Sequence, residues 1–174
     1  MLGRLEGSEQ DLMPRPRLTL EDLRELCDTY VPNESRHDNS WDSDEWWCAH
    51  EIGHLLTVAP SGIGAPQFGL SEGTGKLTEQ RRHELLCREL AAMHVSRRLL
   101  TTASRADLVN DEQKATAYDT LYYDDRGDVR RILAEHGCLR LPTTRTGLEL
   151  RLQQVTETYR GRVGAAPRPY LFSA

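Results

Sequence analysis

Apolar residues recur three or four positions apart over most of the chain, a spacing typical of amphipathic helices. Thr19 and Ser43 are suitable N-caps for the first two of these stretches, because a side-chain hydroxyl can accept the free backbone N–H groups of a first turn. Gly137 stands where a helix ending near residue 136 needs a left-handed C′ residue. The sequence predicts helices over about residues 20–30, 43–57, 78–100, 107–123, 125–136 and 146–163. The expected fold is therefore mainly α.

The segment from Pro60 to Gly75 interrupts this pattern, since it holds two prolines and five glycines. It is too rich in helix breakers for a helix, and a strand or a loop around residues 65–70 fits it equally well. An α+β fold with a small sheet beside the 43–57 helix therefore stays open. An extended segment with a glycine-rich rim could also pair with a peptide by strand addition.

The chain of 174 residues falls within the usual size of one domain, so we expect a single domain over residues 18–163. Residues 1–17 contain glycines and prolines without apolar periodicity and are expected to form a flexible lead-in. Residues 164–174 contain two further prolines and are expected to form an extended tail.

Composition excludes several classes of function. The net charge of −5 comes from acidic and basic residues mixed along the chain, with no basic block to bind phosphates, so nucleic acid is not an expected partner. No apolar stretch approaches the roughly 20 residues that span a bilayer, and the N-terminus lacks the apolar core of a secretory signal. We expect no membrane partner and a cytoplasmic location. The four cysteines form no CxxC pair, so reduced and mostly buried thiols are expected.

The candidate chemistry lies in the stretch AHEIGHLL, residues 49–56, which contains an HExxH motif. His50 and His54 are four residues apart, so on a helix both imidazoles project from one face and can bind one metal ion. Glu51 is poorly aimed as a third ligand but is placed to take a proton from water activated by the metal. The surrounding helix is strongly apolar, which disfavours a chance spacing on a solvated helix, and Gly53 leaves room for a neighbouring element.

Glu89 is the predicted third metal ligand. Its neighbours three and four residues away on the 78–100 helix are all apolar, so its carboxylate lies in the middle of an apolar face. A carboxylate buried there without a partner costs several kcal/mol, whereas a divalent cation stabilises it. Glu84 is the fallback, although its polar neighbours suit a solvent-facing residue. The bland alternative for Glu89 is a buried salt bridge, to an arginine such as Arg105 or Arg131.

The region from residue 44 to residue 100 resembles the ImmA/IrrE-like metallopeptidases, which are gluzincins. The residues that carry this resemblance are His50, Glu51, Gly53, His54, Glu89, Ala92, Leu99 and Leu100. The resemblance implies a zincin-like fold and a metal held by an HExGH-type motif and a glutamate on a later helix. A shorter stretch, Gln67, Phe68 and Gly69, resembles the elongation factor P hydroxylases, which implies an iron (Fe²⁺) centre and oxygen-dependent hydroxylation.

The function expected from the motif is a zinc (Zn²⁺) dependent metallopeptidase acting on a peptide or protein substrate. His50, His54 and Glu89 would hold the ion, and Glu51 would serve as general base. The iron hydroxylase and a non-catalytic metal-binding or interaction protein remain as alternatives. Four side chains are open as donors to an oxyanion, and these are His94, Tyr118, Tyr122 and Tyr123.

Overall fold

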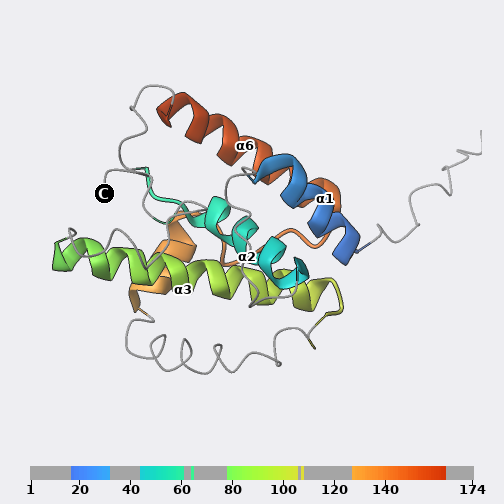
Figure 1. Cartoon of the computed structure of the whole chain (residues 1–174), viewed down its shortest axis with the longest axis horizontal. Coiled ribbons are helices and arrows are strands. Elements are labelled where there is room, and N and C mark those ends of the chain that lie inside the picture. The colour runs from blue at the N-terminus through green and yellow to red at the C-terminus, as the bar shows by residue number, and fades with distance from the viewer. Residues whose placement is uncertain are drawn as a thin grey trace, which may run out of the picture.

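The structure is a computed structural model, which describes residues 17–31, 44–60, 64, 78–105, 107 and 127–163. It contains the helices α1 (Leu20–Tyr30), α2 (Asp44–Thr57), α3 (Glu79–Thr102) and α6 (Arg145–Val163), and a further helical segment over residues 127–135 (Figure 1). These ranges contain no strand, so the prediction of a mainly α fold is confirmed. The possible strand at 65–70 and nearly all of the predicted 107–123 helix lie outside the described residues, as do most of the lead-in and the tail.

Helix α1 begins at the predicted cap. The Thr19 side chain accepts a hydrogen bond from the Asp22 backbone N–H, and the Asp22 carboxylate accepts one from the Thr19 N–H at 2.8 Å. This reciprocal pair satisfies two backbone donors that the first turn of a helix leaves free. The apolar stripe of the helix, Leu23, Leu26 and Cys27, is buried against the rest of the core.

Helix α2 is the central element of the fold. It contacts α1, α3 and α6, and in Figure 1 it lies between the long α3 and the pair formed by α1 and α6. Every residue from Cys48 to Thr57 is buried. A helix buried on all its faces must be apolar nearly all round, so polar side chains on it need partners within the protein.

Helices α2 and α3 cross in close contact at Gly53. A Cβ atom added to Gly53 would lie 2.4 Å from the Ala92 carbonyl oxygen of α3, a distance that real Cβ atoms do not reach. The absence of a side chain therefore lets the two backbones approach each other between the turns that carry His50 and His54. The predicted role of this glycine in leaving room for a neighbouring element is confirmed.

The 127–135 segment ends as the sequence predicts. Gly137 has a φ of 61°, and the backbone N–H of Cys138 reaches the Leu133 carbonyl at 2.6 Å while that of Gly137 reaches Ala134 at 2.9 Å. This pair of bonds is a Schellman motif, which satisfies carbonyls that the last turn leaves free. The buried Val129, Ile132 and Leu133 hold the segment in the core.

The four cysteines have the expected reduced and buried state. All four are buried, and none forms a disulfide. Burial raises the pKa of the Cys138 thiol to about 11, partly opposed by Arg151 and Arg98, so this thiol stays protonated at neutral pH. Among the described residues, no helix is both long and apolar enough to cross a membrane.

Candidate metal centre

The structure brings His50, His54 and Glu89 together where α2 crosses α3. Nε2 of His50 lies 2.9 Å from one carboxylate oxygen of Glu89, and Nε2 of His54 lies 3.2 Å from the other. The two Nε2 atoms are themselves 3.0 Å apart. Three potential ligands from two helices therefore converge on one point, with their donor atoms facing each other.

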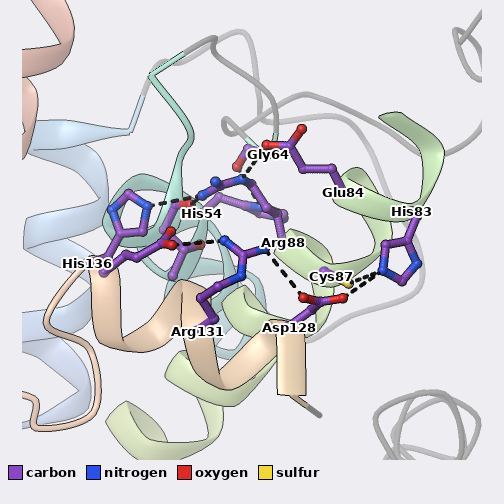
Figure 2. Close-up of polar contacts among 11 residues, drawn as sticks. His54, Gly64, His83, Glu84, Cys87, Arg88, Asp128, Arg131 and His136 are labelled. Carbon is purple, nitrogen blue, oxygen red and sulfur yellow. Dashed lines mark hydrogen bonds and ion pairs between the residues drawn. The ribbon is translucent and has the colours of Figure 1, made fainter. Parts of the chain in front are cut away.

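A backbone contact fixes the tautomer of His54. Its Nδ1 lies 3.0 Å from the Gly64 carbonyl oxygen, which can only accept, so Nδ1 carries the hydrogen (Figure 2). In a neutral imidazole this leaves the Nε2 lone pair directed toward His50 and Glu89. A histidine that donates through one ring nitrogen to a carbonyl and offers the other to an ion is the usual arrangement of metal ligands.

A tryptophan orients the other imidazole. The rings of Trp46 and His50 stack with centroids 4.6 Å apart and an interplanar angle of 13°. Trp46 stands one turn before His50 on α2, so the helix itself places it over the ring. The His50 Nδ1 atom is buried without a hydrogen-bond partner among the described residues, so stacking and Glu89 set the position of this ring.

The buried Glu89 carboxylate needs positive charge beside it. Burial alone would lower the pKa of His54, but the adjacent Glu89 carboxylate outweighs burial and, with Glu51 and the Gly64 carbonyl, raises this pKa to about 9. Burial would raise the pKa of Glu89, but His54 and His50 hold it well below its ordinary value. In the metal-free protein a proton on His54 therefore supplies positive charge beside the buried carboxylate.

The donor set fits a divalent metal ion. Atoms bound tetrahedrally to one zinc ion lie roughly 3.3–3.7 Å apart, given ligand distances of about 2.0–2.3 Å. The observed separations of 2.9 to 3.2 Å are hydrogen-bond distances that need to widen by only a few tenths of an ångström. Two imidazoles and one carboxylate leave a further coordination position for water or substrate.

Glu51 lies close to the two histidines. Its side chain is buried at 8% exposure, and its carboxylate lies within 4.8 Å of the ligand atoms of both histidines. Glu89 contacts both Nε2 atoms directly, while the Glu51 carboxylate is near enough to reach a water molecule between the groups. The direct contacts of Glu89 fit a ligand, and the role of Glu51 as general base stays a prediction.

The rivals of Glu89 lie elsewhere. Glu84 is 39% exposed and pairs with Arg88 at 3.5 Å, as a solvent-facing residue would. Arg105 pairs with Asp107 at 2.9 Å and Arg131 with Glu135 at 2.8 Å, so neither forms the salt bridge considered for Glu89. The partners of Glu89 in the structure are the two motif histidines.

Arg88 is a supporting residue that the sequence reading did not identify. It is 5% exposed, and its NH1 group donates to the Thr57 carbonyl at the end of α2 and, at 3.1 Å, to His136 (Figure 2). Burial lowers the pKa of Arg88, and this is partly offset by Glu84. The side chain fastens the end of the motif helix to α3, next to Glu89. Three of its four neighbours at three and four residues, Leu85, Ala91 and Ala92, are apolar, so the pattern that selected Glu89 could also have indicated this burial.

Of the predicted oxyanion donors, only His94 lies among the described residues. His94 is half-buried, and burial together with Arg98 and Arg97 lowers its pKa, so it is neutral at pH 7. The three tyrosines considered for the oxyanion lie outside the described residues. No oxyanion donor is therefore assigned.

Comparison with known proteins adds no assignment, since no family model, no curated protein and no solved structure matches this chain.

Proposed function

We propose that the protein is a metal-dependent hydrolase of the zincin type that cleaves peptide bonds in a peptide or protein substrate. The observation that carries this proposal is the buried Glu89 carboxylate, whose two oxygens face the Nε2 atoms of His50 and His54. Inside an apolar crossing this carboxylate needs positive charge beside it, which a proton on His54 supplies in the metal-free protein and a metal ion would supply in its place. Its residue types are those of a gluzincin centre with an open position.

Each residue of the centre would have a separate part in hydrolysis. His50, His54 and Glu89 would hold zinc, which supplies a Lewis acid for the carbonyl and lowers the pKa of water toward neutrality. Glu51 would accept a proton from the attacking water and deliver it to the leaving amine. Gly64 and Trp46 would keep the imidazoles oriented, while the buried surroundings of α2 exclude competing water.

A second candidate shares the same donors. Two histidines and one carboxylate are also the facial triad of non-haem iron oxygenases, so the ligand set alone does not choose between hydrolysis and hydroxylation. The position of Glu51 favours hydrolysis, because a buried carboxylate beside the open position serves as the base that a zincin needs. Metal identity separates the two candidates.

The test combines metal analysis with peptide cleavage. Protein purified without added metal would be assayed for bound zinc and iron, and then incubated with a mixed peptide library whose cleavage is followed by mass spectrometry. We expect zinc in the wild type and in Glu51→Gln. We expect hydrolysis to fall about 10²–10⁴-fold in Glu51→Gln, the usual contribution of a general base.

Glu84→Gln is the matched control, since it makes the same change to an exposed glutamate on α3 and should retain both zinc and activity. Bound iron, or equal cleavage by wild type and Glu51→Gln, would overturn the proposal. Zinc without cleavage in any variant would instead assign a non-catalytic metal centre.

A further inference from the structure

A second cluster of metal-ligating side chains lies between α3 and the 127–135 segment. His83 and Cys87 stand one turn apart on α3, and Asp128 reaches them from the neighbouring helix (Figure 2). Nε2 of His83 lies 3.0 Å from Oδ2 of Asp128 and 3.5 Å from Sγ of Cys87. The three potential ligand atoms all lie within 4.8 Å of one another.

Both contacts converge on the same nitrogen of His83. In a nucleophile–base–acid relay, the two partners of the histidine bind opposite ring nitrogens, so that a proton can pass through the ring. Here Cys87 and Asp128 both approach Nε2, where a single hydrogen would be shared between them. Convergence on one nitrogen is poor geometry for proton relay but is what ligands around one ion require.

The spacing and chemistry of the donors also suit an ion. Imidazole nitrogen, thiolate sulfur and carboxylate oxygen are all zinc ligands, and around one zinc ion they lie roughly 3.3–3.7 Å apart. The observed separation of 3.5 Å lies within that range, and that of 3.0 Å would need to widen by a few tenths of an ångström. Arg131 contacts the other oxygen of Asp128 at 3.5 Å, which leaves Oδ2 turned toward His83.

The cluster is partly exposed to solvent. The Cys87 residue is 1% exposed, whereas the side chains of His83 and Asp128 are each 47% exposed. The hydrogen bond from His83, helped by Arg131, lowers the pKa of Asp128, so its carboxylate is ionised at neutral pH. An ion can therefore enter from solvent past His83 and Asp128, bind the buried Cys87 sulfur, and keep a water molecule as its fourth ligand.

We propose that His83, Cys87 and Asp128 form a second metal site, which binds a zinc ion and joins α3 to the 127–135 segment. This site does not depend on the hydrolase proposal, since it shares no ligand with the centre at His50, His54 and Glu89. Because it includes a sulfur ligand, it also has a spectroscopic signature that the buried centre lacks.

Cobalt substitution tests the site directly. Metal-free protein would be titrated with Co²⁺, and the thiolate-to-cobalt charge-transfer absorption would be recorded in wild type, Cys87→Ala, His83→Ala and Asp128→Ala. We expect the band in wild type and its loss in Cys87→Ala, with at least a tenfold weaker cobalt affinity in the other two variants. Zinc content should fall by one ion per chain in Cys87→Ala.

Two controls keep the outcome interpretable. Cys27→Ala removes an equally buried thiol from α1 and should retain the band. Glu89→Gln should retain it too, which separates this site from the buried centre. His83 and Asp128 are exposed enough for their variants to fold, so these two variants still test the site if Cys87→Ala fails to fold. A cobalt affinity that is unchanged in both His83→Ala and Asp128→Ala, or a band that is absent from wild type, would overturn the proposal.

Discussion

The two clusters both include side chains of α3 and have a similar arrangement, but they lie at different depths in the protein. Each combines a pair of ligands one helical turn apart with a carboxylate from a neighbouring helix, but His50, His54 and Glu89 are nearly buried, while His83 and Asp128 are about half exposed. Charge without a counter-charge is expensive in the interior and inexpensive at the surface. The buried carboxylate therefore needs positive charge beside it, from a proton on His54 or from a metal ion, whereas the surface cluster is tolerated without one.

The depth also changes how each cluster is held in place. The buried centre is fixed by the close helix crossing at Gly53, by the Gly64 carbonyl and by Trp46. The surface cluster relies on Arg131 and on the packing of one short helix. Supporting contacts of this kind orient ligands before the ion arrives. We therefore expect tighter binding at the buried centre.

The largest effect should come from removing the charge of Glu89. Glu89→Gln keeps the shape of the side chain but loses the anion that faces both imidazoles. Loss of a residue that only supports a ligand weakens metal binding by up to about 100-fold, so loss of this ligand should weaken zinc binding at the buried centre by more than that. Competition with a chromophoric chelator measures this. Glu84→Gln should bind zinc as the wild type does, and equal affinities for the two variants would break the comparison between buried and exposed carboxylates.

The pH dependence of the metal-free protein should reveal the buried charge pair. The folded-state pKa of His54 is about 9, above its ordinary 6.5, so its contribution is fully present below pH 6.5 and is lost as pH rises through 9. Glu89 has a lowered pKa, so its contribution is present above its ordinary 4.5 and is lost in acid. With excess chelator, the free energy of unfolding should fall by roughly 3 kcal/mol between pH 6.5 and 9.

Urea denaturation across this range is the measurement, with Glu89→Gln as the control, since Glu89 contributes most to raising the pKa of His54 and only Glu51 and the Gly64 carbonyl remain without it. The decline should be much weaker in that variant. A wild type whose stability stays constant or increases between pH 6.5 and 9 would contradict the assigned pair.

A smaller effect should follow from separating the two central helices. The Cβ added by Gly53→Ala meets the Ala92 carbonyl, so the helices must shift, at a cost of about 1–3 kcal/mol for overpacking. Gly127→Ala is the matched control, because an added Cβ there has no atom within 4 Å. Gly53→Ala should also weaken zinc binding at the buried centre while sparing the cobalt–thiolate band, and unchanged stability would show that the crossing is not tight.

Local patterns in the sequence were enough to predict the elements of the fold. Helices α1, α2, α3 and α6 lie within a residue or two of their predicted ranges, because caps and apolar periodicity are short-range signals. Gly137 ends its helix as predicted. Glu89 could be selected because a charged residue with apolar neighbours on one helix face already implies a buried partner.

Contacts between distant segments were not predictable in the same way. Nothing near Asp128 indicates that it meets His83, which lies 45 residues away in the chain. The Gly64 carbonyl and the contacts of Arg88 depend likewise on how the helices pack. The stacking of Trp46 on His50 is the exception, since their separation of four residues on one helix could have suggested it.

The central claim is that one metal ion binds between α2 and α3. Crystals of the protein with zinc, measured on both sides of the zinc absorption edge, locate the ion by anomalous scattering. We predict a peak about 2.0–2.2 Å from Nε2 of His50, Nε2 of His54 and a carboxylate oxygen of Glu89. A zinc-loaded crystal in which these three side chains keep their direct contacts, with no anomalous peak between them, would contradict the account.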